Sequence, residues 1–332
     1  MAHQLQITVL GAGSIGLLFV SSLLSVAPKN VRLLSRRTPS SRFGDNKFQI
    51  TLNDPLSSPI LIPEINAKDY TNVNNEILLV ATKCYDAVSA VQSLLPFSSS
   101  CPQPTIVLLC NGSLGLKEQL AKIDSLDSSK VVFGSTTNGA VRNGSNVNHL
   151  GVGQNWFEQP EPDVTANANK DYKNKTTENS PLSSLKDILD KSNNLGKTTL
   201  LHSSSIKPLL YEKLAANCVI NPLSAIHKVK NGDVLEAPGA RETFAAVVDE
   251  IATCAAQEGV DLGEDPTTRL ANFVLEVIDD TRENKSSMLI DVEMRRKTEV
   301  DYFNGWVADQ LPTTTSSCRM LYTKIKMIEK DF

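Results

Sequence analysis

The 332-residue chain is long enough for about two domains, each with a sizeable buried core. Its composition, 41% hydrophobic and 21% charged, is that of a globular protein and excludes a disordered or collagen-like chain. The 33 basic and 37 acidic side chains leave a net charge of -4, which gives no electrostatic basis for binding nucleic acid or an anionic membrane.

The six cysteines are scattered without a C-x-x-C pair, which favours a reducing cytoplasmic location over secretion. The four histidines lie far apart and lack zinc-ligand spacing, so we expect no metal. The N-terminus has no signal-peptide pattern, and its most apolar run is too short to span a bilayer. We therefore expect a soluble protein, monomeric or homodimeric, that acts on a small molecule.

The first predicted elements are a strand over residues 5–10, a glycine turn, and a helix over residues 16–27. Further strand-like runs, separated by helical stretches, follow at 31–34, 76–81, 105–109 and 131–133. This alternation predicts a parallel sheet covered by helices on both faces. We assign this first domain to residues 1–200.

From residue 158 to about 194 the chain is rich in Asn, Lys, Thr and Pro, which predicts a loop or insertion at about 159–197. The hydrophobic pattern of the sequence then changes to that of long helices, with no convincing strand. The predicted helices span 206–226, 241–258, 267–279, 287–311 and 316–330. The second domain, residues 201–332, should be all-helical.

A G-x-G-x-x-G pattern lies directly between the first strand and the first helix. Its residues are Gly11, Ala12, Gly13, Ser14, Ile15 and Gly16. In a dinucleotide-binding loop the first glycine permits a tight turn, the second lets the backbone approach the pyrophosphate, and the third allows close helix packing. The alternative is a glycine-rich turn that binds no ligand.

The second strand ends in Leu-Leu-Ser-Arg-Arg, with Arg36 and Arg37 where an NAD-binding fold usually places an acidic residue. Arginine can neutralise a 2′-phosphate through charge-assisted hydrogen bonds, so this end favours NADPH over NADH. The alternative is that both arginines are simply solvated.

Three polar residues, Lys213, Asn217 and Asn221, recur every fourth position among apolar or small residues. On a helix they form one narrow stripe. The stripe could be the solvent face of an amphipathic helix, but two asparagines are poor helix formers unless they bond something specific. Because reduction of a carbonyl needs a proton for the developing alkoxide, Lys213 is the candidate acid.

A second dense segment, residues 286–305, carries Ser287 and Glu299. The two are twelve residues apart, about a third of a turn off register on an ideal helix, so spacing alone does not unite them. Its charges could equally form an ordinary exposed helix face.

Together these stretches resemble the ketopantoate reductases (2-dehydropantoate 2-reductases) over nearly the whole chain. The matching motifs are VLGAGSIG, ATKCYDAV, CNGSLG, GSTTNGAVRNG, KLAANCVINPLSAI and SSMLIDVEMRRKTEVDYFNG. The resemblance implies an α/β N-terminal Rossmann-type domain and an all-α C-terminal domain like that of 6-phosphogluconate dehydrogenases. It also implies NADPH-dependent reduction of 2-dehydropantoate to (R)-pantoate in pantothenate and coenzyme A biosynthesis.

By position, the resemblance implies that Lys213 is the catalytic lysine and that Glu299 helps organise cofactor and substrate. It implies cofactor contacts at the glycine loop, Arg36, Lys83, Asn111, Ala140 and Glu299. It implies substrate contacts at Asn111, Lys213, Asn217, Asn221, Asn231 and Ser287.

The chain departs from the family at Cys110, where Gln or His is frequent, at Ser224, where Thr is frequent, and in the long Asn/Lys-rich stretch. Two other functions stay open: a reductase of another small 2-keto acid, and a non-catalytic NADPH-sensing protein. A sensor would need only the cofactor residues, so the joint presence of Lys213, Glu299, Asn217 and Ser287 favours an enzyme.

Overall fold

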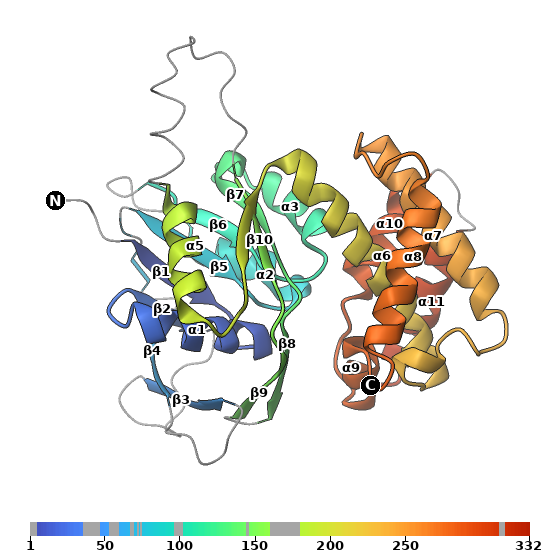
Figure 1. Ribbon diagram of the computed structural model, residues 1–332, viewed down its shortest axis with the longest axis horizontal. Coiled ribbons are helices and arrows are strands. Elements are labelled where there is room, and N and C mark those ends of the chain that lie inside the picture. Colours follow the sequence, from blue (N-terminus) through green and yellow to red (C-terminus); the bar gives the residue numbers. More distant parts are fainter. Residues whose placement is uncertain are drawn as a thin grey trace, which may run out of the picture. The chain divides into compact units, whose positions relative to one another are not determined.

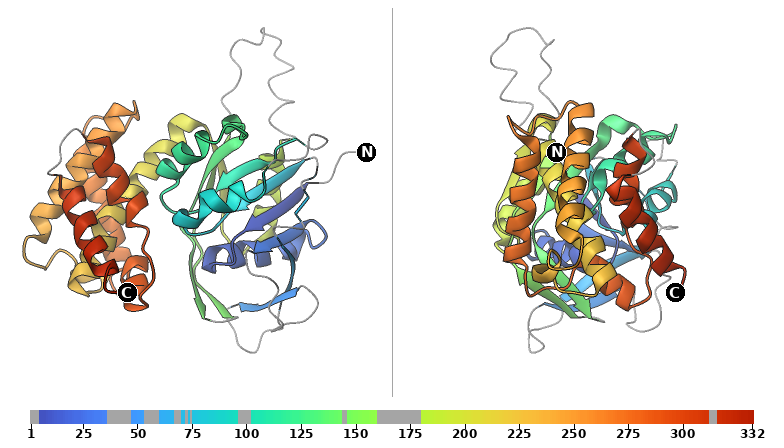
Figure 2. Two further views of the ribbon diagram at one scale, coloured as in Figure 1. Left: turned by 180° about the vertical axis from the view of Figure 1, so that it is seen from behind. Right: turned by 90° about the vertical axis from the view of Figure 1, so that its right-hand side faces the viewer.

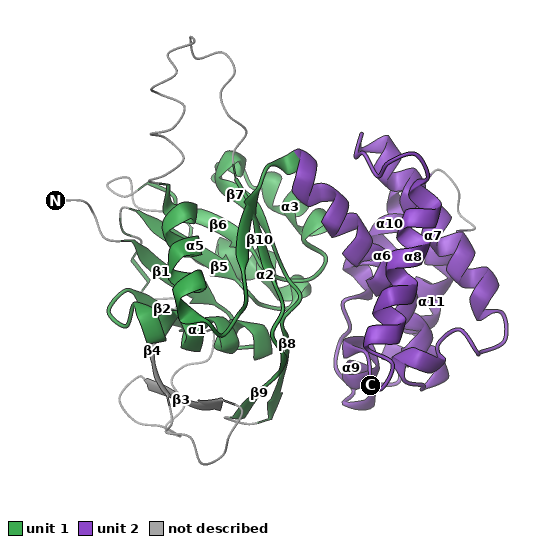
Figure 3. Ribbon diagram, in the orientation of Figure 1, with its two compact units in different colours: residues 1–203 green, residues 204–332 purple. Residues whose placement is uncertain are grey.

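The computed structural model describes residues 5–35, 47–52, 60–66, 70–71, 73, 75–95, 102–143, 146–159, 180–311 and 316–332. The chain divides into two units, residues 1–203 and residues 204–332, which Figure 3 colours separately. Within the described ranges, no helix is both long and apolar enough to cross a membrane.

Unit 1 is built on one sheet, to which the described residues contribute eleven strands in the order β11-β10-β7-β6-β5-β1-β2-β4-β3-β9-β8. The strands are β1 (Gln6–Leu10), β2 (Val31–Ser35), β3 (Lys47–Leu52), β4 (Ile60–Asn66), β5 (Glu76–Val80), β6 (Thr105–Leu108), β7 (Val131–Thr136), β8 (Gly139–Asn143), β9 (Asn146–Gly151), β10 (Asn155–Glu158) and β11 (Thr198–Leu201). The six strands from β7 to β4 are mutually parallel. The predicted parallel sheet is confirmed, and its five predicted runs are β1, β2, β5, β6 and β7.

Antiparallel pairs extend this parallel centre on both sides, and the sequence analysis did not predict them. β10 runs antiparallel to β7, β3 to β4, and β8 to β9. Because β8 and β9 are rich in asparagine and glycine, they lack the apolar signature of a buried strand.

Helices cover both faces of the sheet: α1 (Ser14–Val26) and α5 (Pro181–Ser192) on one face, α2 (Cys84–Gln92) and α3 (Ser113–Ala121) on the other (Figures 1 and 2). A short 3-10 turn, η2 (Ser128–Lys130), precedes β7. Ile7 and Val9 of β1 point into the core beneath α1, because alternate residues of a strand face the same side. This burial fixes the end of β1 where the glycine loop begins.

Within the loop or insertion predicted at about 159–197, residues 181–192 are not a loop, because they form α5. Ser180 caps this helix by accepting a hydrogen bond from the Ser183 amide at 3.1 Å. Leu182, Leu185 and Leu189 form its buried stripe. Three leucines at helical spacing are a weak signal in a polar stretch, and their role depends on the sheet that they cover. Residues 160–179 lie outside the described residues.

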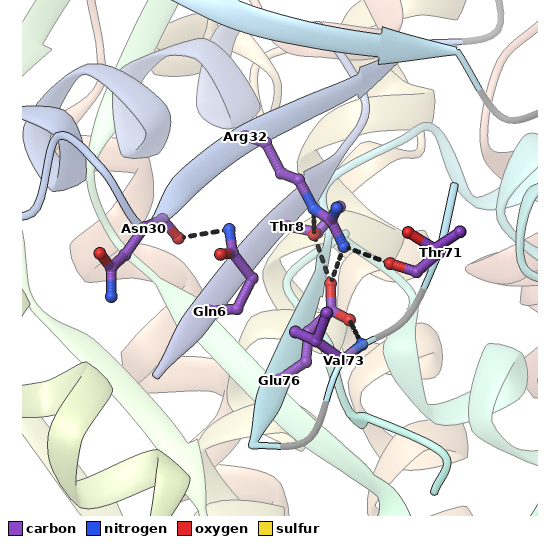
Figure 4. A network of polar contacts seen from close by, with 7 residues as sticks. All are labelled: Gln6, Thr8, Asn30, Arg32, Thr71, Val73 and Glu76. Atoms are coloured by element: carbon purple, nitrogen blue, oxygen red, sulfur yellow. Dashed lines mark hydrogen bonds and ion pairs between the residues drawn. The ribbon is translucent and has the colours of Figure 1, made fainter. Parts of the chain in front are cut away.

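A buried ion pair joins β1, β2 and β5 toward the amino ends of β2 and β5 (Figure 4). The Glu76 carboxylate accepts hydrogen bonds from Thr8 Oγ1 at 2.5 Å and from Arg32 Nη2 at 2.9 Å. Its second oxygen accepts from the Val73 amide at 3.1 Å, and Arg32 also donates to the Thr71 carbonyl. The network therefore connects β1, β2 and β5 toward the strand ends that lie opposite the glycine loop.

The described part of unit 2 is helical, as predicted. Its elements are α6 (Ser203–His227), η3 (Asn231–Asp233), α7 (Ala240–Gln257), α8 (Pro266–Asp280), α9 (Ser287–Glu293), η4 (Val300–Tyr302), α10 (Asn304–Gln310) and α11 (Ser317–Glu329) (Figure 1).

The single helix predicted over 287–311 is wrong, since α9, η4 and α10 share this span. Arg295 adopts a left-handed conformation, with φ at 49°, which an α-helix cannot contain. Thr298 instead bonds Glu329 of α11 through both its amide and its hydroxyl, each at 2.7 Å. A contact 31 residues away, invisible to helical periodicity, thus sets the path of the chain.

Candidate active site

Two of the three loop glycines are required by the packing of the protein itself. Gly11 has φ at 118°, and a Cβ there would lie 2.8 Å from the Thr82 amide nitrogen. A Cβ on Gly16 would overlap the Gly11 carbonyl oxygen. These glycines let the loop turn tightly after β1 and let α1 start close against it.

Gly13 has no such reason to be a glycine. Its φ is -76°, and a Cβ added there would meet its nearest neighbour, the Ala81 oxygen, at 3.6 Å, an ordinary contact. Gly13 is exposed and is the N-cap residue of α1, whose first turn has no acidic residue. Close approach of a phosphate to the helix N-terminus explains a glycine here, so the loop fits a dinucleotide.

The other three loop residues complete the turn into α1. Ala12 and Ile15 pack against the hydrophobic core of unit 1, and Ser14 is the first residue of the helix. The side chains of Ala12 and Ile15 thus anchor the loop on the core.

The strand order reverses direction at β1, which lies between β5 and β2. Ligands of open α/β sheets bind at the carboxyl ends of the strands at such a point. The loops after β1, β5 and β6 carry the glycine loop, Lys83 and Asn111, respectively. Lys83 is the N-cap residue of α2, and the Asn111 carbonyl accepts a hydrogen bond from the Cys84 thiol. The structure therefore brings these predicted cofactor residues to one edge of the sheet.

The β8–β9 hairpin brings Ala140 to the same loop. Ala140 pairs with His149 across the hairpin and packs against the same core cluster as Ala12. Arg142, two residues further on the same strand, donates a hydrogen bond to the Ala12 carbonyl. The sequence analysis did not single out Arg142, although a strand places residues 140 and 142 on one face.

Arg36, the predicted contact of the 2′-phosphate, lies outside the described residues, as does Arg37. The strand that precedes them, β2, pairs directly with β1.

In unit 2 the predicted stripe lies on α6, and Asn221 donates a hydrogen bond to the Asn217 side chain at 3.2 Å. Lys213 and Asn217 are half-buried, whereas Asn221 is only 6% exposed. The residues between them are buried as well. An ordinary solvent face does not bury an asparagine this deeply, so the stripe belongs to a polar site within an apolar helix.

Ser286 joins α9 to this stripe. Its hydroxyl lies 2.5 Å from the hydroxyl of Ser224, three residues beyond Asn221, and accepts from the Leu289 amide as the α9 cap. The predicted substrate residue Ser287 follows it as the exposed first residue of α9. Ser286 was not predicted as a site residue, although a serine before an apolar run is a typical N-cap.

Asn231 is buried beside the chain that leads into α9. Its side-chain amide donates to Thr281 Oγ1 at 2.9 Å, and its backbone amide donates to the Asn284 carbonyl at 3.0 Å. Its side-chain oxygen has no hydrogen-bond partner within the described part of the chain. A buried acceptor of this kind is available to a ligand.

Glu299, buried to 5% exposure, lies between two anchors. Thr298 before it bonds Glu329 of α11, and Asn304 after it donates a hydrogen bond to the Cys218 carbonyl of α6 at 2.9 Å. Cys218 directly follows Asn217. The hydrogen bond from Asn304 therefore connects the segment that carries Glu299 to α6, the helix that carries the stripe.

Comparison with known proteins agrees with this geometry. The family described as "Ketopantoate reductase PanE/ApbA" matches residues 7–162, and its C-terminal counterpart matches residues 205–329. The chain belongs to the ketopantoate reductase family. The 2-dehydropantoate 2-reductase of Vibrio cholerae is 31% identical over 332 residues, covering 99% of each chain.

Solved structures share the ketopantoate reductase fold over nearly the whole chain. A probable 2-dehydropantoate 2-reductase from Bacillus subtilis matches with a TM-score of 0.70 and 24% identity, covering 98% of this chain and 100% of its own. A D-mandelate dehydrogenase solved with NADH and anilino(oxo)acetate matches with a TM-score of 0.75 and 19% identity, covering 98% and 99%. The predicted α/β and all-α architecture is thus confirmed as that of this family.

The two residues that depart from the usual ketopantoate reductase pattern lie beside predicted site residues. Ser224 retains the hydroxyl that meets Ser286, and Cys110 is buried directly before Asn111.

Proposed function

We propose that this ketopantoate reductase family member reduces 2-dehydropantoate to (R)-pantoate with NADPH, in pantothenate and coenzyme A biosynthesis. The observation that carries the proposal is the polar stripe of α6, which places a half-buried lysine, a half-buried asparagine and a buried asparagine in one line among buried residues. A sensor would need only the cofactor residues. The curated relative from Vibrio cholerae bears the name of this activity.

The residues of unit 1 would hold the cofactor. The amides around Gly13 would bind the pyrophosphate, with Lys83, Asn111 and the backbone of Ala140 as further contacts. Bound NADPH supplies the hydride for the keto carbon. Arg142 keeps the glycine loop in place by its hydrogen bond to Ala12.

The residues of unit 2 would bind the substrate and move its proton. Lys213 would hydrogen-bond the keto oxygen and donate the proton that the developing alkoxide needs. Asn217, Asn221, Asn231 and Ser287 would bind the carboxylate and hydroxyl groups, with the unpartnered oxygen of Asn231 accepting from a hydroxyl. Glu299 would orient both ligands.

Preference for NADPH over NADH rests on Arg36, whose guanidinium can pair with a 2′-phosphate. We expect Arg36→Ala to weaken NADPH binding by about tenfold or more, the scale of one charge-assisted contact, and to leave NADH binding nearly unchanged. Titration of both cofactors by fluorescence measures this. An equal loss for both would contradict the assignment.

The proposal also covers the cellular location and the oligomeric state of the protein. Among the described residues, the cysteines at positions 84, 110, 218, 254 and 318 are buried and form no disulfide, which supports a reducing cytoplasm. We expect a monomer or a homodimer.

The experiment that tests the function is loss of NADPH absorbance with ketopantoate, alongside pyruvate and 2-ketoisovalerate. Strong preference for ketopantoate is the expected result, because these controls lack the hydroxyl group that the asparagines would bind. Preference for another keto acid would leave a reductase with a different substrate. Tight NADPH binding without turnover on any keto acid would contradict the enzyme and favour the sensor.

A further inference from the structure

Pro222 lies inside α6, five residues before the helix ends at His227. In an α-helix each carbonyl accepts a hydrogen bond from the amide four residues later. Proline has no amide hydrogen, so the Cys218 carbonyl loses its donor within the helix. This carbonyl lies in the buried part of α6, where an unpaired polar group is costly.

The side chain of Asn304 supplies the missing donor. Its Nδ2 donates to the Cys218 carbonyl at 2.9 Å, which is ordinary hydrogen-bond length. Asn304 is fully buried, and the same nitrogen lies 3.8 Å from the Cys318 sulfur. The side chain thus turns its donor group toward α6, and the bond replaces one that Pro222 removed.

The residue after Asn304 allows this approach. A Cβ on Gly305 would lie 3.1 Å from the Tyr322 ring of α11. The Asn-Gly pair therefore places an amide donor at the start of α10 while α10 packs closely on α11.

The hydrogen bond to the Cys218 carbonyl lies within the polar stripe of α6. Cys218 follows Asn217 and precedes Asn221 by three residues, so the freed carbonyl belongs to the helical turn that holds both asparagines. Asn304 itself comes two residues after η4, which begins directly after Glu299. One hydrogen bond therefore connects the two groups of predicted site residues in unit 2.

We propose that Asn304 is a positioning residue, which substitutes for the helix hydrogen bond missing at Pro222 and holds Asn217, Asn221 and Glu299 in register for the substrate. This inference rests on the proposed function, since it names what sets the substrate-binding geometry of that site.

The test is a double-mutant cycle of Asn304→Ala and Pro222→Ala in the full chain. Alanine at 222 restores an amide that can bond the Cys218 carbonyl, so it should compensate for the loss of Asn304. We expect Asn304→Ala to lower kcat/KM for the keto acid by about 10- to 100-fold, mainly through KM, as misplaced binding groups do. Pro222→Ala should stay near the wild type, and the double variant should recover most of the loss.

Urea unfolding midpoints of the same four proteins give a second cycle that does not depend on turnover. The midpoint should fall for Asn304→Ala and rise again in the double variant, so this cycle remains informative even where Asn304→Ala alone folds poorly. Strictly additive effects in either cycle would overturn the inference.

Failure of the two proposals can be told apart. Wild-type protein that reduces no keto acid would overturn the proposed function, and the unfolding cycle would then decide whether Asn304 replaces the proline bond. Wild-type turnover with an unimpaired, fully folded Asn304→Ala variant would overturn the positioning role alone. Cys318→Ala serves as a matched control, because it removes the sulfur near the same nitrogen and should leave kcat/KM nearly unchanged.

Discussion

Two buried polar clusters of this protein differ in how their hydrogen bonds are used. In unit 1, both oxygens of Glu76 are paired, with Thr8, Arg32 and the Val73 amide (Figure 4). In unit 2, Asn231 keeps a buried oxygen without a partner among the described residues.

The difference separates structural polar groups from functional ones. A network that satisfies itself stabilises the fold and offers nothing to a ligand. A buried acceptor left without a partner costs stability and is available to a ligand that brings a donor. Substitutions in the sheet network should therefore affect stability, and those in the site should affect turnover.

The largest expected effect is on stability, in the closed network. Glu76→Ala leaves Arg32 beside Thr8 without its counter-charge, so the free energy of unfolding should fall by about 3 to 5 kcal/mol, as for other broken buried pairs. Urea unfolding measures this. Glu236→Ala is the control, because its pair with Arg241 is largely exposed and should matter little. Loss of turnover in a folded Glu76→Ala protein would contradict the distinction between structural and functional polar groups.

The second prediction concerns the polar stripe of α6. Lys213→Ala should lower kcat by about 100-fold or more, the scale of losing a general acid, and should change unfolding and NADPH binding little. Steady-state kinetics measure it. Lys207→Ala, on the same helix, is the matched control, because Lys207 pairs at 3.8 Å with Glu258 instead of joining the stripe. Equal losses for both lysines would contradict the role of Lys213.

The third prediction applies the comparison to the glycine loop. Gly13→Ala should weaken NADPH binding by about tenfold or more while leaving the melting temperature unchanged, since only a ligand requires this glycine. Gly16→Ala should instead destabilise the fold, because its Cβ would meet the Gly11 oxygen. Calorimetry and NADPH titration separate the two. Unfolding by Gly13→Ala would show that packing, not a ligand, explains the residue.

The smallest effect is expected at Glu329. Burial raises the pKa of this carboxyl, but hydrogen bonds from Lys326 and Thr298 outweigh it and lower the pKa below its ordinary value of 4.5. A lowered pKa stabilises the fold above the unfolded-state value, and this stability is lost as pH falls through the folded-state value. Glu329→Gln should therefore cost about 1 to 2 kcal/mol at neutral pH, a difference that disappears in acid.

Unfolding of wild type and Glu329→Gln between neutral pH and about pH 3 tests the prediction. The matched control is Glu293→Gln, whose pair with Lys285 is nearly half exposed, so its cost should be small at every pH. A cost for Glu329→Gln that stays constant with pH would show that the negative charge is not what stabilises the segment around Glu299.

Sequence reasoning succeeded where the signal is local. The glycine loop could be predicted because its strand, turn and helix adjoin one another in the chain. The stripe of Lys213, Asn217 and Asn221 could be predicted because residues four apart lie on one face of a helix, whatever packs against that helix. The role of Lys213 as an acid was inferred from carbonyl chemistry, the roles of the two asparagines came from the resemblance, and all of them remain predictions.

Sequence reasoning failed where a distant partner decides. Helix α5 was not predicted because its three leucines can be recognised as a buried stripe only when the sheet that they cover is known. The span 287–311 was predicted as one helix because the bonds from Thr298 to Glu329 leave no periodic trace.

By itself, the sequence determined five of the parallel strands, the loop suited to a dinucleotide and the polar stripe, since all three follow from short-range spacing and backbone geometry. Only the tertiary structure decided that Ser286 meets Ser224, that Arg142 reaches the glycine loop, and that Asn304 donates to Cys218. The last pair lies 86 residues apart. Such contacts depend on which buried polar groups lack a local partner, and the folded chain alone shows which distant side chain supplies one.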